Sequence, residues 1–251
     1  MAQQRLDKII AATGRYSRRE VKTLVREGRV LVDGRIAASA EDKCDPLIAR
    51  ISVNGEELFY REHTYVMLHK PAGVLSATED GRGETVLDLL APEYRKIGLF
   101  PVGRLDKDTE GLLILTDDGA LAHDLLAPKK HVDKVYFVRT DGALDDADCK
   151  AFAQGITLGD GLECLPAKLE VLKSGAQSEA LVTIREGKFH QIKRMLASRG
   201  KPVLYLKRLR MGTLALDESL PKGEYRLLTA EEVKNLRGSG QFAQGKTGEN
   251  K

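Results

Sequence analysis

The sequence PVGRLDKDTEGLLILTDDG, residues 101–119, places a charged loop directly before a short apolar run. The run, Leu112 to Leu115, ends at an Asp-Asp-Gly turn, and its short length between turn signals favours a buried strand over a helix. Asp106 is then expected on a loop just ahead of a rigid, buried element. Such a position suits a catalytic carboxylate, because the loop gives access to substrate while the strand behind it holds the loop in place.

The same loop also has a simpler interpretation. Mixed charges at this spacing are typical of solvated surface loops, and spacing alone favours that interpretation over catalysis. A resemblance reverses the preference. Residues 103–119 resemble the signature of the RsuA family of RNA pseudouridine synthases, in which Gly-Arg-Leu-Asp is followed by Thr or Ser, Gly-Leu-Leu and Thr-Asn/Asp-Asp-Gly. The aspartate of that signature corresponds to Asp106.

The composition is that of a soluble globular protein with one large or two smaller domains. The chain has 251 residues, of which 42% are hydrophobic and 31% charged, and no apolar run approaches the length of a membrane span. Arg5, Asp7 and Lys8 interrupt the early apolar stretch, so no secretory signal is expected. We therefore expect a cytoplasmic protein with no membrane partner.

Cysteine and charge totals give little direct information about function. Cys44, Cys149 and Cys164 are widely spaced and form no metal-ligand motif with the five histidines, so no metal site is expected. A net charge of +3 is too small to imply nucleic-acid binding by itself. The distribution of the basic residues is more informative than their total.

The N-terminal region is basic, with nine Lys or Arg against four Asp or Glu between residues 3 and 35. The pattern predicts a short helix ending at Gly14, a second helix capped by Ser17 and Glu20, and a tight hairpin over residues 30–36. The second helix presents a row of cations, which either bind phosphates or are merely solvated, and charge alone leaves both open. The row consists of Arg18, Arg19, Lys22, Arg26 and Arg29.

Three motifs in this region resemble the S4 RNA-binding domain. They are Arg-Leu-Asp-Lys at 5–8, Ser-Arg-Arg-Glu at 17–20 and Gly-Arg-Val-x-Val-Asp-Gly at 28–34. The resemblance implies that residues 1–60 form a small α/β domain that binds RNA, with Arg18, Arg19 and Lys22 in contact with it. Residues 61–237 would then form the catalytic domain, and the glycine-rich stretch 238–251 is expected to be a disordered tail.

The catalytic region begins with a predicted strand, Tyr65 to Lys70, that ends at a Lys-Pro turn and resembles the family's Asn/His-Lys-Pro-x-Gly motif. Apolar residues between 86 and 90 predict a helix before Pro92. Residues 134–139 predict a strand on which Tyr136 points opposite to its neighbours. The pattern alone fits a core tyrosine equally well, but the segment resembles the family's Lys-x-Tyr motif, whose tyrosine lies beside the aspartate.

A second basic region follows, with nine Lys or Arg against one Glu between residues 185 and 210. A helix is predicted from His190, with Ile192, Met195 and Leu196 buried, and a strand from Val203 to Leu206. The basic residues around these elements predict a second positive surface that includes Arg208. Residues 186–195 resemble a family motif in which the residue at Lys193 pairs with the catalytic aspartate. Arg194 is assigned to substrate binding.

The resemblance covers nearly the whole chain and implies an α+β fold, in which a mostly antiparallel mixed sheet is flanked by helices. It implies a pseudouridine synthase that acts without a cofactor or metal on a uridine of ribosomal RNA, most closely the small-subunit 16S type. Asp106, Tyr136 and Lys193 would form the catalytic group, and Arg104 would fill the space left by the everted base. The partner would be ribosomal RNA or an assembling subunit, bound by a monomer.

Three alternatives remain at this stage. The chain could modify large-subunit 23S ribosomal RNA or transfer RNA. It could be a non-catalytic RNA-binding factor in ribosome assembly, although the presence of Asp106 and Tyr136 disfavours this. It could also be a metal-dependent hydrolase that uses Asp106, Asp108, Asp117 and Asp118.

Overall fold

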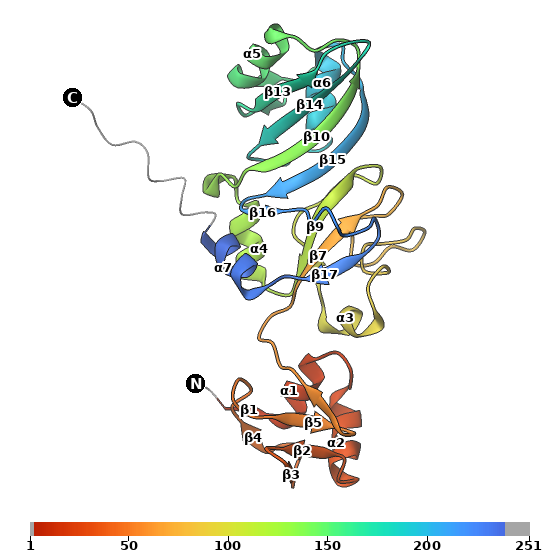
Figure 1. The fold of residues 1–251 in the computed structure, drawn as a ribbon, viewed down its shortest axis with the longest axis vertical. Coiled ribbons are helices and arrows are strands. Elements are labelled where there is room, and N and C mark those ends of the chain that lie inside the picture. The colour runs from red at the N-terminus through yellow and green to blue at the C-terminus, as the bar shows by residue number, and fades with distance from the viewer. Residues whose placement is uncertain (1–2, 239–251) are drawn as a thin grey trace, which may run out of the picture. The chain divides into compact units, whose positions relative to one another are not determined.

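The structure is a computed structural model that describes residues 3–238. The chain divides into two compact units (Figure 1). The first comprises the residues up to Thr64 together with Leu90–Leu99, and the second comprises Tyr65–Leu89 and the chain from Phe100 onward. Of the predicted tail, Gly238 is the last residue of a helix, and 239–251 lie outside the described residues.

The first unit combines short helices with a four-stranded antiparallel sheet of order β3-β2-β5-β6. The helices are α1 (Leu6–Ala12), α2 (Arg18–Arg26) and α3 (Pro92–Ile97). The strands are β2 (Val30–Val32), β3 (Arg35–Ile36), β5 (Ile51–Val53) and β6 (Glu56–Leu58), with a separate pair formed by β1 (Gln4–Arg5) and β4 (Lys43–Cys44).

The start of α2 confirms the predicted capping box. The Ser17 hydroxyl accepts from the Glu20 amide, and the Glu20 carboxylate accepts from the Ser17 amide. Two of the unpaired N–H groups at this helix end are thereby satisfied. The apolar face of α2 joins α1 and the sheet in one core, while its cations remain exposed.

The predicted helix over residues 86–90 is wrong. These residues form turns, and helix α3 begins at Pro92, the residue expected to end a helix. The Val86 amide donates to the Leu75 carbonyl, and the Thr85 amide donates to the Asp88 carboxylate, so these groups are paired outside any helix. Proline suits the first turn of α3 because the N–H that it lacks has no partner there.

The second unit is built on a nine-stranded sheet whose main path is β13-β14-β10-β15-β9-β7-β17, with β8 and β16 paired at its side. Its strands are β7 (Tyr65–Lys70), β8 (Phe100–Pro101), β9 (Glu110–Thr116), β10 (Lys134–Asp141), β13 (Lys168–Lys173), β14 (Gln177–Ile184), β15 (Val203–Met211), β16 (Leu214–Ala215) and β17 (Tyr225–Leu227). All the paired neighbours are antiparallel except β15 and β9.

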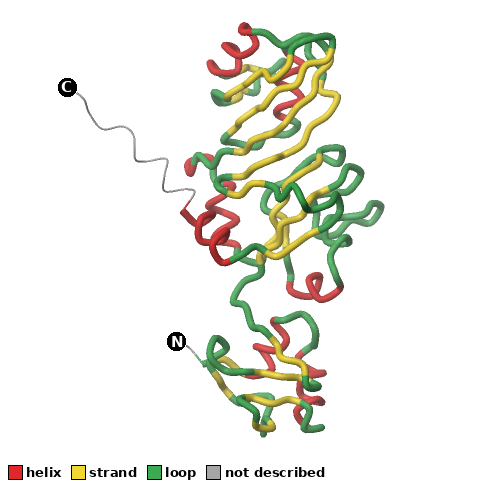
Figure 2. The backbone as a smooth tube through the Cα atoms, viewed as in Figure 1, coloured by secondary structure: helices red, strands yellow, loops and turns green. Residues whose placement is uncertain are grey.

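Helices lie beside this sheet rather than within its path (Figure 2). They are α4 (Gly119–Leu126), the 3-10 turn η1 (Pro128–Lys130), α5 (Asp146–Gln154), α6 (Gln191–Ser198) and α7 (Ala230–Gly238). A small separate hairpin consists of β11 (Ile156–Thr157) and β12 (Glu163–Cys164). The architecture confirms the predicted α+β fold with a mixed, mostly antiparallel sheet.

Strand β9 occupies the interior of the sheet, as predicted from its apolar run. Leu112, Leu113, Ile114 and Leu115 have no exposed surface. Burial on both faces explains why the run lacks the alternation of polar and apolar residues that marks a half-exposed strand. The loop that carries Asp106 therefore leads directly into a fully buried strand of the core.

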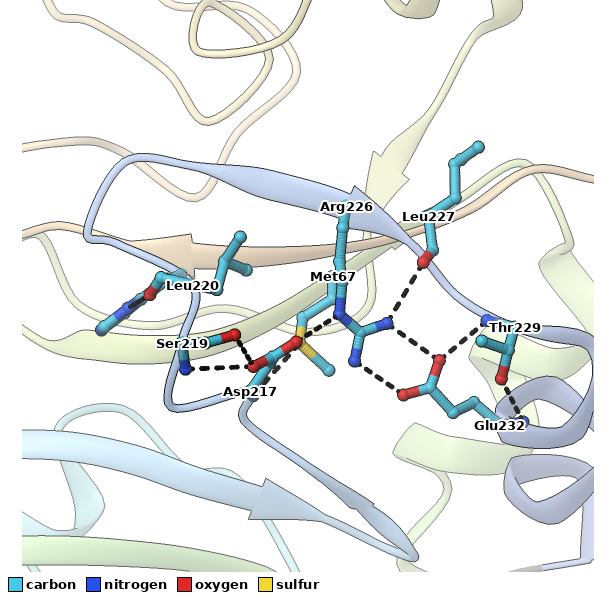
Figure 3. A network of polar contacts seen from close by, with 9 residues as sticks. Met67, Asp217, Ser219, Leu220, Arg226, Leu227, Thr229 and Glu232 are labelled. Carbon is cyan, nitrogen blue, oxygen red and sulfur yellow. Dashed lines mark hydrogen bonds and ion pairs between the residues drawn. The ribbon is translucent and has the colours of Figure 1, made fainter.

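The segment after β16 is fixed by an arginine that joins two acidic side chains (Figure 3). Arg226 donates to Asp217 at 2.8 Å and makes two hydrogen bonds with Glu232, at 2.8 and 2.9 Å. The Glu232 carboxylate also accepts from the Thr229 amide, and the Thr229 hydroxyl accepts from the Glu232 amide. This network ties the edge strand β17 to the capping box at the start of α7.

The parallel junction between β9 and β15 requires a glycine. Gly111 has φ +106° and pairs with Arg208, and a Cβ built on Gly111 would lie 2.2 Å from the Arg208 carbonyl oxygen. Real Cβ atoms do not approach backbone oxygens so closely, and a side chain at this φ is strained in any case. The two halves of the sheet can join here because residue 111 has no side chain.

We predict that Gly111→Ala destabilises the protein by at least about 2 kcal/mol, since strain at positive φ adds to an overpacking clash with backbone. Chemical denaturation would measure the loss. Gly119→Ala is the matched control, because Gly119 lies in helix α4 with no atom within 4 Å of the added Cβ. That control should be neutral or slightly stabilising. Equal stability of the two variants would contradict the close approach at Gly111.

Candidate active site

A buried lysine holds the loop that carries Asp106. The Lys70 side chain, at the end of β7, has no exposed surface and donates to the backbone carbonyls of Pro71, Asp106, Lys107 and Thr109 at 2.9 to 3.2 Å. Ser76 contributes a second attachment, because its hydroxyl donates to the Leu105 carbonyl and accepts from the Leu105 amide. The loop is thus fixed through its backbone, and the Asp106 carboxylate remains free to interact elsewhere.

The Asp106 carboxylate is paired with Lys193, as the resemblance implied. Lys193 Nζ, on helix α6, lies 2.9 Å from Asp106 Oδ2 and 2.5 Å from Asp108 Oδ1. Burial lowers the pKa of Lys193, but hydrogen bonds to Asp108 and Asp106 outweigh burial and leave the pKa above its ordinary value. The hydrogen bond from Lys193 in turn lowers the pKa of Asp108. One ammonium therefore contacts two carboxylates.

Tyr136 faces the same space from strand β10. Its side chain is buried and lies on the same face of the sheet as Lys134 and Val138, while Val135 and Phe137 point to the other face, as predicted. Arg104, Asp106, Tyr136 and Lys193 line one small cavity, and the first three also line an adjoining cleft of about 790 Å³. The structure therefore brings the predicted acid, cation and phenol together.

Two residues next to Asp106 were missed by sequence reasoning. His190 Nε2 lies 3.6 Å from Asp106 Oδ1, and the exposed ring of Phe189 stacks on the imidazole at 3.8 Å. His190 has φ +50° and is the residue from which α6 starts. A histidine at the start of the predicted helix was the available signal, because the first turn of that helix carries Lys193.

The other predicted binding residues are distributed unevenly. Arg18, Arg19 and Lys22 are exposed on α2 in the first unit, and Arg19, Lys22 and Arg26 line an open groove. Arg194 does not line the Asp106 cavity but pairs with Asp160 at 2.6 Å.

The predicted positive surface over residues 185–210 needs a correction. Arg208 is only 2% exposed and donates through Nε to the Leu112 carbonyl, so its assignment to a surface is wrong. In strand β15, Arg208 is buried, whereas Lys207 is partly buried and Arg210 is exposed. Arg185, Arg194 and Arg199 are each paired with an aspartate, which reduces the net charge of the region.

Two negative observations apply to residues 3–238. In that range no group of three or more His, Cys, Asp or Glu side chains is arranged to hold a metal ion. No helix in the same range combines the length and apolar composition that a bilayer crossing needs. Of the aspartates considered for a metal site, Asp118 caps α4 and pairs with Arg237, whereas Asp106 and Asp108 share Lys193.

Comparisons with known proteins agree with this geometry. Residues 64–198 match the model of the RNA pseudouridylate synthase family, and residues 4–46 match the S4 domain. The chain is 48% identical to the RNA pseudouridine synthase YtzG of Bacillus subtilis, over 91% of this chain and 96% of the relative. It is 40% identical to ribosomal small subunit pseudouridine synthase A of Vibrio cholerae, over 92% and 99% of the two chains.

A solved structure gives the same result for the fold. A crystal structure of a pseudouridylate synthase superposes with a TM-score of 0.64 at 37% identity, over 93% of this chain and 99% of that chain. The matched region includes both the basic first unit and the cavity around Asp106.

We predict that Lys193→Met raises the pKa of Asp108 to its ordinary range, because the hydrogen bond that lowers this pKa is lost. Carboxyl NMR titration of labelled aspartate would measure it. The pKa of Asp108 is lower in the folded protein than in the unfolded chain. The pair of Asp108 and Lys193 therefore stabilises the fold above the ordinary aspartate pKa, and this stabilisation is lost as the pH falls through the folded value. Lys150→Met, on exposed α5, is the control and should leave the Asp108 titration unchanged.

Proposed function

The chain belongs to the RNA pseudouridine synthase family, in its RsuA-type branch, and on that premise we propose that it isomerises one uridine of small-subunit 16S ribosomal RNA. The observation that supports this most directly is the contact of 2.9 Å between Asp106 and Lys193 in a cavity that Tyr136 also lines. The relatives from Vibrio cholerae and Pseudomonas aeruginosa that are named for the small ribosomal subunit favour the 16S substrate.

The proposed reaction needs a carboxylate at the ribose. The bond between the ribose carbon and uracil nitrogen one breaks, the base turns, and a new bond forms from the ribose to carbon five. Uridine and pseudouridine are isomers, so the step balances without an oxidant or a second substrate. Asp106 assists by attacking the nucleotide or by supporting bond cleavage and proton removal. Lys193 contacts the Asp106 carboxylate at 2.9 Å and fixes its direction.

Tyr136 and Arg104 are assigned to the nucleotide itself. A base inside a helix cannot reach Asp106, so it must leave its stack, which costs a few kcal/mol and costs least in loops. We assign Arg104, two residues before Asp106 on the same loop, to the space that the base vacates. We assign the ring of Tyr136 to stacking with the everted uracil, and its hydroxyl to proton removal at carbon five.

RNA outside the active site is held chiefly through phosphates in this proposal. The exposed cations of α2 supply contacts that depend on charge and carry little sequence information. The exposed ring of Phe189 at the cleft offers a flat surface on which a neighbouring base can stack. The partner is accordingly ribosomal RNA, free or in an assembling subunit, bound by a single copy of the chain.

The target uridine can be identified by mapping. Pseudouridines in ribosomal and transfer RNA would be compared between cells with and without the gene. Loss of one site in 16S RNA would support the proposal, whereas loss of a site in 23S RNA or transfer RNA would assign the substrate to that molecule. No loss at any site would favour a non-catalytic role in ribosome assembly.

We predict that Asp106→Asn lowers isomerisation by at least about a thousandfold, because the amide can neither attack nor accept a proton. Release of tritium from RNA labelled at carbon five of uridine would measure the rate, and RNA affinity should be retained. Asp124→Asn, which alters an exposed ion pair with Lys130, is the control and should be active. Substantial turnover by the Asp106 variant would remove this carboxylate from the mechanism.

We predict that replacing Arg18 and Arg19 together by Ala weakens RNA binding and flattens its salt dependence. Each lost phosphate contact should reduce the slope of log affinity against log salt by about 0.7 to 0.9. The control replaces Lys150 of α5 and Lys173 of β13 together by Ala. Both are exposed cations, so the change in net charge is the same but lies away from α2. If both double variants bind alike at low and high salt, the α2 face is only solvated.

A further inference from the structure

Two buried cations lie beneath the cleft and are not used in the mechanism described above. Lys134 is 5% exposed and Arg208 is 2% exposed, yet both line the cleft of about 790 Å³ together with Asp106 and Tyr136. The pairing of β10 with β15 places Arg208 directly opposite Tyr136. Lys134 precedes Tyr136 by two residues and so lies on the same face of the sheet.

Neither cation is neutralised by the part of the chain that the structure describes. In residues 3–238, neither forms an ion pair with a carboxylate. Lys134 donates only to the Val132 carbonyl at 3.1 Å, and Arg208 donates through Nε to the Leu112 carbonyl at 2.7 Å. Arg208 Nη2 is buried without any hydrogen-bond partner. Asp133, which attracts Lys134, is already paired with Arg185 at 2.8 Å.

Such an arrangement is costly for folding alone. An uncompensated buried charge costs several kcal/mol even after relaxation of its surroundings. Burial, and then the positive charge of Arg208, lowers the pKa of Lys134 to about 8, which agrees with the unfavourable setting of the charge. Groups that violate the rules of polar burial concentrate at functional sites, where a ligand or reaction intermediate supplies the missing partner. The missing partner of two cations is an anion.

The proposed reaction generates an anion at this place. When the ribose–uracil bond breaks heterolytically, its electron pair leaves with the base, and the negative charge spreads over nitrogen one and the two carbonyl oxygens. Carbon five then bonds to the ribose, loses its proton, and nitrogen one gains a proton. A base that stacks on Tyr136 is next to Arg208 and Lys134. The phosphates of the RNA stay outside the cleft, where exposed cations of the protein can contact them.

We propose that Lys134 and Arg208 form a cationic floor that stabilises the uracil anion while the base is detached from the ribose, an inference that rests on the proposed function. The floor is fixed before the substrate arrives and lies in a water-poor setting. Cations placed in this way act most strongly on charge that develops in the transition state, and little on the neutral base in the ground state. The floor therefore changes the rate of the chemical step more than the affinity for RNA.

The test is Lys134→Met, which removes the charge and keeps an unbranched side chain that is one atom shorter. Single-turnover tritium release at saturating enzyme should fall about a hundredfold. The dissociation constant for the same RNA should stay within about twofold of the wild type. The melting temperature should be equal or higher, because a buried unpaired ammonium is replaced by an apolar group. Lys134→Arg, which keeps the charge, should recover most of the rate.

Lys207→Met is the matched control. Lys207 is adjacent to Arg208 on β15 but pairs with Phe137, so it lies on the opposite face of the sheet from Tyr136. Its replacement makes the same change in net charge and in side-chain shape. We expect single-turnover rates within about twofold of the wild type for this variant, because its charge lies on the other face of the sheet, away from the cleft.

Three outcomes would overturn the proposal. A rate for Lys134→Met within twofold of the wild type would show that the charge does not act on the reaction. Weaker RNA binding with a flatter salt dependence and an unchanged rate would assign Lys134 to a phosphate. A marked fall in melting temperature would show that the ammonium is compensated in the free protein. Failure of the proposed function itself is separate, since the wild-type chain would then release no tritium.

Discussion

The position of Asp106 depends on one buried ammonium group. Lys70 donates to four carbonyl oxygens, three of which belong to the loop that carries Asp106. The Asp106 and Lys107 carbonyls also accept from the Thr109 and Gly73 amides, so the ammonium adds to the backbone bonds that hold this loop. Lys70 is the last residue of strand β7, which pairs along its length with β9. The loop is therefore attached to the core at both of its ends. The carboxylate itself takes no part in holding its own backbone and is left for chemistry.

The order of strands in the sheet explains how distant residues reach one cavity. Asp106 precedes β9, Tyr136 lies on β10, and β15 separates these two strands in the sheet. Lys193 comes from α6, which directly precedes β15 in the chain. The pair of β9 and β15, the one parallel strand pair in the described main sheet, therefore places the aspartate loop beside the other two residues. It requires a residue without a side chain at Gly111.

Local patterns in the sequence predicted the elements that are determined locally. The apolar run of β9, the capping box at Ser17 and the buried stripe of α6 all depend on residues within a few positions of one another. The failures depend on distant contacts. Leu75 pairs with the segment expected to be a helix at 86–90, and Arg208 resembles Arg210 in sequence but is buried under a cleft. The resemblance supplied the pairing of Asp106 with Lys193, whereas the roles of Lys70 and Lys134 depend on burial, which charge counts do not reveal.

The distribution of charge in the cavity fits a reaction in which electrons move from the ribose toward the base. On one side of the cavity, Asp106 and Asp108 share the ammonium group of Lys193. Lys134 and Arg208 make the floor beside Tyr136 positive. A nucleotide with its ribose at Asp106 and its base on Tyr136 would lie between these regions. Fixed charges of opposite sign at the two ends of the breaking bond lower the energy of the separated state without requiring either end to move.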